Sequence, residues 1–317
     1  MDDEARKALT RRIKMKGLEL GFSHVGVIPC HDFPGYAAEV RARNGYERFI
    51  DNPASFYAGC FPSEFFSQGK SIVCATFGFG DVEYPPELLK YIGRIYLARC
   101  YVPVPDNVAG KRLEAMGEFL ELQGMEVYRG NIELPARPIC AEAGLVTYGN
   151  NNFVYTEEDG SFVVLYTWLV DTELEYDQAP IENECPPDCN LCLKACPTGA
   201  IESPRHLNPM KCVLLNCLIP NGQADPKAMG TYIHGCDICQ EVCPRNHDVL
   251  HRAKRKDPFL EKLAVDFDLE RVAELDSLDD DYYRDVLRPV MYNYIRDPAV
   301  FRRNAERALA AEHIFEE

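Results

Sequence analysis

The feature that most constrains this chain is a run of cysteines between residues 185 and 244. Nine of the fourteen cysteines lie in this stretch, and the spacing Cys-x-x-Cys-x-x-x-Cys-Pro occurs in it twice, ending at Cys196-Pro197 and at Cys243-Pro244. Two-residue gaps let a tight loop surround a small metal centre, whereas the last cysteine of each run lies too far along to join its neighbours and reaches a second centre. The spacing therefore predicts two 4Fe–4S clusters, held as in a bacterial ferredoxin.

Two other uses of paired cysteines fit the sequence less well. Disulfides require an oxidising compartment, and the pair Arg11-Arg12 lacks the apolar region of a twin-arginine export signal. Zinc ribbons use paired Cys-x-x-Cys, but they do not need a third cysteine followed by proline in both halves. Cluster binding is therefore the favoured interpretation.

Length and charge limit the class of protein. The chain has 317 residues, which is enough for two domains, and its formal net charge is −16. We expect nucleic acid to be an unlikely partner, because a nucleic-acid backbone is neutralised by Lys and Arg, and an anionic membrane surface is disfavoured for the same reason. No run approaches the roughly eighteen apolar residues of a membrane-spanning helix. These observations predict a cytoplasmic protein with no membrane contact.

Periodicity divides the chain before and after the cysteines. Predicted strands at 71–79 and 160–171 alternate with predicted helices, including one at 111–123, and this alternation favours an α/β domain over residues 1–178. No Gly-x-Gly-x-x-Gly follows a strand, so a Rossmann nucleotide site has no support. We expect three parts: residues 1–178, a cluster domain at 179–250 and a helical C-terminal extension at 251–317.

Several segments resemble the superfamily of epoxyqueuosine reductases and reductive dehalogenases, over about residues 5–250. The matching segments are Leu134–Leu145, Tyr148–Tyr155, Gly160–Phe162, Cys196–Ile201, Arg205–Cys212 and Gly235–Asn246. The resemblance implies an α+β (α/β) fold in which a nitroreductase-like domain, binding base-off cobalamin and substrate, precedes a ferredoxin-like domain with two 4Fe–4S clusters. It also implies that electrons pass from the clusters to cobalt. The Asp-x-His-x-x-Gly pattern of His-on cobalamin binding is absent.

The resemblance also implies which cysteines bind each cluster. One cluster would take Cys185, Cys189, Cys192 and Cys243, and the other would take Cys196, Cys212, Cys236 and Cys239. Cys217 is left over as a buried thiol. The gap between Cys185 and Cys189 is one residue longer than is usual in the superfamily, so Cys217 stays an alternative ligand.

Three departures from the superfamily pattern affect the expected function. Epoxyqueuosine reductases carry an aspartate as proton donor. The matching position in this chain is near Gly130, and the only carboxylate nearby is Glu133. The family's Gly-Lys-Asn is Gly149-Asn150-Asn151 here. The members that bind tRNA have a basic surface and often a C-terminal helical repeat, whereas this chain is acidic. We therefore expect a small organic substrate rather than tRNA.

A reductase of this kind needs a proton donor beside the substrate and a cation or amide that stabilises negative charge. The candidates for these catalytic roles are Tyr148, Glu133, Arg99 and Arg137. Those for cofactor binding are Tyr148, Asn150 and Asn151.

Three functions fit these observations. The first is a cobalamin-dependent reductase of a small molecule, supplied by an external low-potential electron donor such as a ferredoxin or flavodoxin. The second is an electron-transfer protein without its own substrate. The third is a reductive activator of another corrinoid protein. The first is favoured because a bare ferredoxin would need little more than the cysteine-rich segment.

Overall fold

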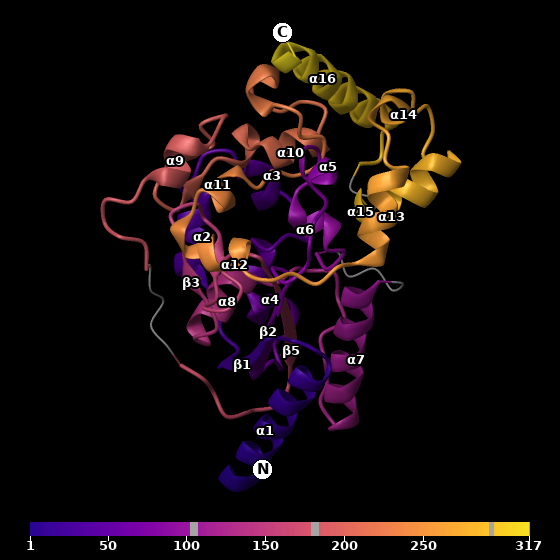
Figure 1. Cartoon of the computed structure of the whole chain (residues 1–317). Helices are drawn as coiled ribbons and strands as arrows, with labels where there is room; N and C mark the ends of the chain where they lie inside the picture. Colours follow the sequence, from indigo (N-terminus) through magenta and orange to yellow (C-terminus); the bar gives the residue numbers. More distant parts are fainter. Residues whose placement is uncertain (102–106, 179–183, 292–294, 317) are drawn as a thin grey trace. The chain divides into compact units, whose positions relative to one another are not determined.

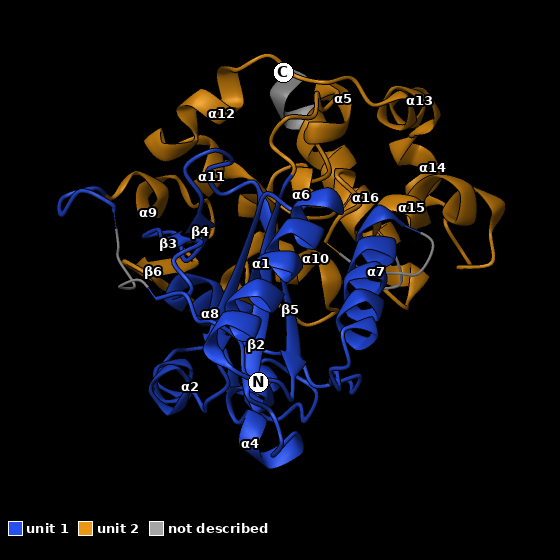
Figure 2. Ribbon diagram, turned by 90° about the horizontal axis from the view of Figure 1, so that it is seen from below, with its two compact units in different colours: residues 1–78, 103–189 blue, residues 79–102, 190–317 orange. Residues whose placement is uncertain are grey.

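The computed structural model describes residues 1–101, 107–178, 184–291 and 295–316, and the chain divides into two compact units (Figures 1 and 2). Unit 1 contains Met1–Gly78 and Pro103–Cys189, and unit 2 contains Phe79–Val102 and Asn190–Glu317. This division differs from the expected one, because residues 79–102 group with most of the cysteines and residues 251–317 form no unit of their own. The expected boundary at 178–179 borders residues 179–183, which lie outside the described residues.

Unit 1 is built on a three-stranded antiparallel sheet. Its strands are β1 (His24–Pro29), β2 (Ser71–Gly78) and β5 (Val163–Val170), in the order β1-β2-β5. In the central strand Cys74 pairs with Gly26 on one side and with Thr167 on the other. The strands read as nearly continuous apolar runs because most of their side chains are buried. Antiparallel pairing beside helices makes the fold α+β, as the resemblance predicted.

Helices and short elements surround this sheet within unit 1. They are α1 (Asp3–Glu19), α2 (Pro34–Arg41), α3 (Glu47–Ile50), η1 (Ala58–Cys60), α4 (Pro62–Phe65), α7 (Val108–Leu122), α8 (Ala136–Glu142), β3 (Thr147–Tyr148) and β4 (Val154–Tyr155). Helix α8 crosses β1 so closely that a Cβ added at Gly26 would lie 2.8 Å from the Cβ of Ala143, and this crossing needs glycine. The core between α8 and the sheet includes Ile139 from α8 and Ile72 and Cys74 from β2.

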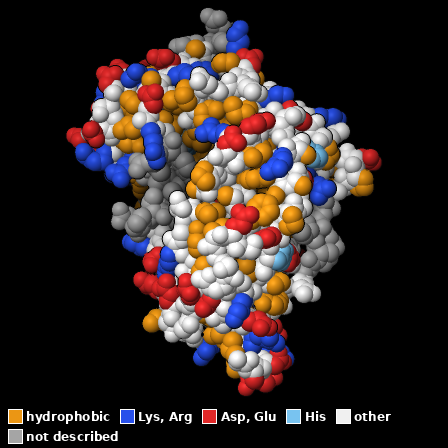
Figure 3. All heavy atoms as spheres, turned by 180° about the vertical axis from the view of Figure 1, so that it is seen from behind, with side chains coloured by type: hydrophobic (Ala, Val, Ile, Leu, Met, Phe, Trp, Pro, Cys, Tyr) orange, Lys and Arg blue, Asp and Glu red, His pale blue; other side chains and the backbone are white. Residues whose placement is uncertain are grey.

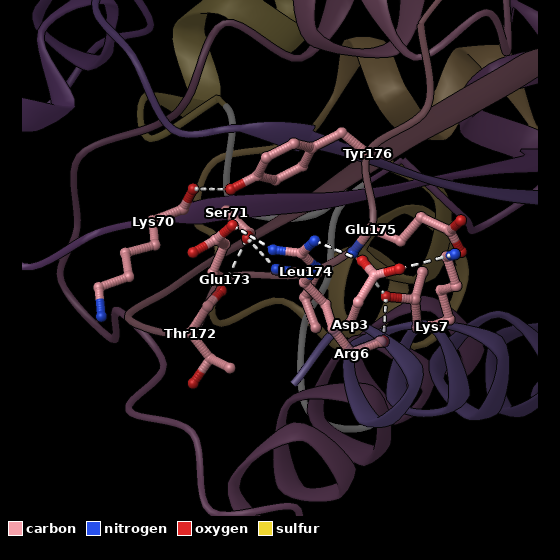
Figure 4. Close-up of polar contacts among 11 residues, drawn as sticks. Asp3, Arg6, Lys7, Lys70, Ser71, Thr172, Glu173, Leu174, Glu175 and Tyr176 are labelled. Atoms are coloured by element: carbon pink, nitrogen blue, oxygen red, sulfur yellow. Dashed lines mark hydrogen bonds and ion pairs between the residues drawn. The ribbon is translucent and has the colours of Figure 1, made fainter. Parts of the chain in front are cut away.

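Polar contacts attach the N-terminal helix to the segment that follows β5 (Figure 4). Arg6 of α1 bonds Glu173, and the hydroxyl of Thr10 accepts the backbone N–H of Glu175 at 2.9 Å. The hydroxyl of Ser71 donates to the carbonyl oxygen of Thr172 at 2.7 Å. These contacts join both α1 and the first residue of β2 to the segment that follows β5.

Unit 2 is mostly helical. Its elements are α5 (Pro86–Leu89), α6 (Arg94–Leu97), α9 (Leu191–Ala195), β6 (Ile201–Ser203), β7 (His206–Leu207), η2 (Pro209–Lys211), α10 (Val213–Leu218), η3 (Pro226–Met229), α11 (Ile238–Glu241), η4 (Pro244–Asn246), α12 (His247–His251), α13 (Pro258–Asp266), α14 (Leu269–Ala273), η5 (Tyr283–Leu287), α15 (Arg288–Met291) and α16 (Pro298–Glu316). The short strands β6 and β7 pair antiparallel.

Residues 79–102 belong to unit 2 because they bond the segment around Cys236. The backbone N–H of Gly93 donates to the carbonyl oxygen of His234 at 2.8 Å. The carboxylate of Asp237 caps α6 by accepting the backbone N–H of Arg94, and it also pairs with the Arg94 guanidinium at 2.9 Å. The Asp237 side chain is 5% exposed, so this is a buried ion pair beside a predicted cluster ligand.

Candidate functional site

The cysteines of unit 2 lie in or beside short helices. Cys192 is within α9 and Cys196 caps its C-terminus, while Cys212 caps the N-terminus of α10. Cys239 is within α11, and Cys243 precedes the proline that starts η4. Helix ends leave backbone N–H groups without helical partners. One N–H group, that of Ala200, donates to the sulfur of Cys196 at 3.2 Å, as expected for a cluster thiolate.

In unit 2, the four cysteines predicted to bind one cluster affect one another's pKa values. The pKa of Cys212 is raised to about 11, chiefly by burial and in smaller part by the charge of Cys196. Burial also raises the pKa of Cys236 and of Cys239, and neighbouring cysteines of the same set add to both shifts. Thiols buried together are deprotonated only when a cation compensates their charge. The donor set therefore fits an iron–sulfur cluster.

The first two cysteines of the other predicted set belong to unit 1, where Asn150 contacts both. The backbone N–H of Asn150 donates to the sulfur of Cys185 at 3.3 Å, and its side-chain amide donates to the carbonyl oxygen of Cys189 at 3.0 Å. Asn150 is 5% exposed. The role in cofactor binding that the sequence predicted for Asn150 stays a prediction, and these two contacts connect Asn150 to predicted cluster ligands.

Cys217 has a different environment from the other cysteines of this stretch. Its side chain is completely buried in an apolar cluster with Val213 and Met229. Its sulfur donates to the carbonyl oxygen of Tyr232 at 3.4 Å, and burial raises its pKa to about 12. A protonated thiol in this setting fits the role of a core residue.

The ligand sets themselves stay predictions. Among the residues that the structure describes, no three His, Cys, Asp or Glu side chains are grouped to hold a single metal ion.

Three of the four predicted catalytic residues are close together in unit 1. Arg137 lies in α8, Glu133 shortly before that helix, and Tyr148 in β3. The guanidinium of Arg137 donates to the hydroxyl of Tyr36 at 3.1 Å and to the carbonyl oxygen of Asn152 at 2.9 Å. The sequence thus selected residues that share one polar cluster, although their roles stay predictions.

Electrostatics define the ionisation states in this cluster. Burial lowers the pKa of Arg137, but the phenols of Tyr36 and Tyr148 outweigh that effect, so its pKa is raised and the guanidinium stays charged. Burial raises the pKa of Tyr148, against the opposing charge of Arg137. Surrounding protein also raises the pKa of Glu133, although its side chain is exposed. The arrangement combines a neutral phenol, a carboxyl group with a raised pKa and a fixed cation.

The fourth predicted catalytic residue, Arg99, belongs to unit 2. Its guanidinium pairs with Asp257 at 2.8 Å and lies 3.8 Å from the ring centroid of Phe259. These contacts suit a structural cation, and a catalytic role of Arg99 stays a prediction.

Asn152 is a residue of this cluster that sequence reasoning missed. Its backbone carbonyl accepts from Arg137, its side-chain oxygen accepts from Arg43 at 3.4 Å, and its side-chain nitrogen donates to Tyr46 at 3.5 Å. It has a φ of 68°, a left-handed conformation that asparagine tolerates better than most residues. The run of three asparagines was the available signal. The adjacent Asn151, predicted to bind cofactor, is buried and donates to the hydroxyl of Tyr155 at 2.7 Å.

The fold and the cysteine framework define a double-cluster iron–sulfur protein with an α+β first unit. Residues 185–246 match the protein family described as "4Fe-4S double cluster binding domain", which confirms the prediction of two clusters. Among curated proteins, the chain is 30% identical to epoxyqueuosine reductase of Escherichia coli strain K12 over 258 residues. That match covers 75% of this chain and 65% of the relative, so the chain spans less than two thirds of the relative's length.

Solved structures show the same fold. Epoxyqueuosine reductase from Bacillus subtilis, described with its catalytic loop swung out of the active site, has a TM-score of 0.77 at 23% identity and covers 96% of this chain and 82% of its own. The catabolic reductive dehalogenase NpRdhA has a TM-score of 0.51 at 12% identity, covering 96% of this chain and 37% of its own. The predicted resemblance to this superfamily is confirmed.

One structural relative corrects the expected partners. An epoxyqueuosine reductase solved with an epoxyqueuosine-modified tRNA-Tyr stem loop has a TM-score of 0.73 at 21% identity, covering 96% of this chain and 81% of its own. The expectations that nucleic acid is an unlikely partner and that the substrate is a small molecule are therefore wrong. They relied on net charge, which sums the whole chain, whereas RNA contacts depend on where Lys and Arg lie. These side chains are scattered among the acidic ones on the face drawn in Figure 3.

No described helix has both the length and the apolar character that a membrane crossing requires.

Proposed function

We propose that this protein is a cobalamin-dependent iron–sulfur reductase that acts on an epoxyqueuosine-type nucleoside in tRNA, in the cytoplasm. The observation that carries the proposal is that the chain resembles epoxyqueuosine reductases in sequence and fold and also matches the double-cluster family over residues 185–246. Within the cluster domain, the predicted ligands are Cys185, Cys189, Cys192 and Cys243 for one cluster and Cys196, Cys212, Cys236 and Cys239 for the other.

Reduction of an epoxide to an alkene consumes electrons and protons, and the epoxide oxygen leaves as water. Cobalamin, when bound, supplies the low-potential metal centre that delivers electrons from the clusters. The chain must supply the protons and stabilise the negative charge that develops on the departing oxygen.

The polar cluster of unit 1 supplies both groups. Tyr148 stays protonated at neutral pH because burial raises its pKa. Glu133 provides a carboxyl group with a raised pKa, and the sequence resemblance places it near the aspartate of epoxyqueuosine reductases. Arg137 is fixed by hydrogen bonds to Tyr36 and Asn152, so its charge is available without reorganisation when negative charge develops.

The test uses the full chain, reconstituted anaerobically with iron, sulfide and hydroxocobalamin and freed of excess cofactor. The protein is then incubated with a chemical reductant and a tRNA stem loop that carries epoxyqueuosine, and the nucleosides are analysed by mass spectrometry. We expect loss of the epoxide in the modified stem loop. A protein that retains both clusters and cobalt but leaves the epoxide intact would contradict the proposal. Retention of iron without cobalt would instead favour an electron-transfer protein.

A matched pair of variants tests the proton donor. Tyr148→Phe removes the buried hydroxyl, and we expect turnover to fall on the order of a hundredfold, as for loss of a general acid. Tyr176→Phe removes a hydroxyl that donates to the carbonyl oxygen of Lys70 at 3.1 Å on the surface of the same unit, and it should leave turnover unchanged. Equal rates for the two variants would exclude Tyr148 as the donor.

A further inference from the structure

The C-terminal helix α16 contacts the segment that connects two predicted cluster ligands. Cys212 and Cys236 are separated by a segment whose only regular elements are α10 and the short η3. Several carbonyl groups of this segment are satisfied by side chains of α16 rather than by the segment itself. All of these residues belong to unit 2. The helix lies outside residues 185–246, so the match to the cluster family gives it no role.

Asn304 occupies the centre of this contact. It is 1% exposed, and its side-chain amide donates to the carbonyl oxygen of Cys217 at 2.8 Å and to that of Ile233 at 3.1 Å. Cys217 lies five residues after Cys212, and Ile233 lies three residues before Cys236. A single amide group therefore joins the two ends of the segment close to both ligands.

Two arginines extend the contact along the same face of α16. The guanidinium of Arg303 donates to the carbonyl oxygens of Asn216 at 2.7 Å, Ile219 at 2.9 Å and Pro220 at 3.0 Å. Arg307, one helical turn later, donates to the carbonyl oxygens of Gly230 and Tyr232. Residues four apart lie on one face of a helix, so both arginines reach the same segment.

Arg303 and Asn304 also form hydrogen bonds with each other. The side-chain oxygen of Asn304 accepts two hydrogen bonds from Arg303, at 2.8 and 3.2 Å, so both its amide nitrogen and its oxygen are bonded. The carbonyl oxygens of Asn216 and Cys217 are at the end of α10, where helix carbonyls lack backbone partners. Buried carbonyl groups must be bonded. Without α16, this segment would have to find other partners for them and would shift.

We propose that Asn304, Arg303 and Arg307 are positioning residues that hold Cys212 and Cys236 at the spacing required by one 4Fe–4S cluster. Helix α16 is therefore part of the cluster-binding unit, although it carries no cysteine. The inference rests on the cluster part of the proposed function and is independent of the substrate, because iron content and turnover are separate measurements.

The experiment compares variants of one helix. Asn304→Leu keeps the approximate volume of the side chain but removes both donors, and Arg303→Gln and Arg307→Gln shorten the two arginines. Arg302→Gln is the matched control, since Arg302 donates to the carbonyl oxygen of Leu275 at 2.7 Å and pairs with Asp276, and both residues follow the last cysteine of the chain. Each full-length protein is reconstituted anaerobically, and its iron, acid-labile sulfide and electron paramagnetic resonance spectrum after reduction are measured.

The wild-type protein and Arg302→Gln should hold about eight irons and give the spectrum of two interacting clusters. Asn304→Leu should hold about four irons and give the spectrum of one isolated cluster. Should that variant fail to fold, Arg303→Gln and Arg307→Gln carry the test, with an expected severalfold faster loss of half of the iron to a chelator. Full iron content and control-like chelation kinetics in the variants would overturn the inference. So would equal iron loss in Arg302→Gln, because general weakening of α16 would then explain the result.

Discussion

Cys212, which caps α10, and Cys217, which lies within it, should differ in how much iron the protein loses when the sulfur is removed. Cys212 caps the start of the helix among other buried thiols, whereas Cys217 lies in an apolar cluster and donates to a carbonyl oxygen. We predict that Cys217→Ala retains about eight irons and that Cys212→Ala retains about four. The same helix and the same substitution make each variant the control for the other.

The expected loss of stability for Cys217→Ala is small and follows from its contacts. The substitution removes one buried sulfur, comparable to a methylene group worth about 0.8 kcal/mol, and a weak hydrogen bond worth about 0.5 kcal/mol. A loss of about 1.3 kcal/mol corresponds to a decrease in Tm of roughly 3–5 °C for a unit of this size. Unfolding is followed anaerobically at one scan rate, because unfolding that releases a cluster is irreversible.

The iron content decides the outcome. If Cys217→Ala loses half of its iron while Cys212→Ala retains all of it, Cys217 is a ligand, and the reasoning from its burial and hydrogen bond is refuted. Cys185→Ala completes the comparison, because it should lose iron if Cys185 is the ligand that the sequence resemblance implies.

Three further predictions test other groups. Protein around Glu133 raises the pKa of its carboxyl group above the value in the unfolded chain, so ionisation of this group opposes folding as the pH rises through the raised pKa. Glu133→Gln should therefore increase Tm at pH 7 and have a vanishing effect on Tm at pH 4. A decrease in Tm at pH 7 would contradict this expectation. Asn150→Ala removes the hydrogen bond from the side-chain amide to the carbonyl oxygen of Cys189, and chelators should then remove iron severalfold faster than from the wild-type protein. An unchanged rate of iron loss would contradict a role of Asn150 in holding the cluster. Arg99→Gln breaks the ion pair with Asp257, which should cost about 1 kcal/mol without changing turnover, and a hundredfold loss of turnover would instead support the catalytic role predicted from the sequence.

The sequence predicted the parts of the site that depend on local spacing. Within each Cys-x-x-Cys-x-x-x-Cys-Pro run, two or three residues separate successive cysteines, so the spacing alone predicts two clusters. The ligand sets, which include the distant Cys212, came from the resemblance and stay predictions. The sequence also allowed the polar cluster of unit 1 to be predicted, because Glu133, Arg137 and Tyr148 lie within or next to one short stretch that resembles known reductases. The strands β2 and β5 were evident as apolar runs.

What the sequence could not predict depends on residues far apart in the chain. Nothing near Asn150 indicates that its partner is Cys185, 35 positions later. The grouping of residues 79–102 with unit 2 likewise depends on pairs such as Arg94 and Asp237, 143 positions apart. The tRNA expectation failed for a related reason, since a sum over all charges contains no information about their placement.

The pairing of Arg94 with Asp237 has a consequence for the order in which the protein matures. As the chain leaves the ribosome, residues 79–102 emerge long before the segment around Cys236, so the ion pair between Arg94 and Asp237 forms only after that segment has been made. Helix α16 is synthesised later still. A nascent chain that stalls before Asn304 would therefore present the thiols of Cys212 and Cys236 to the cell's assembly and repair machinery without the contacts that we propose hold them together.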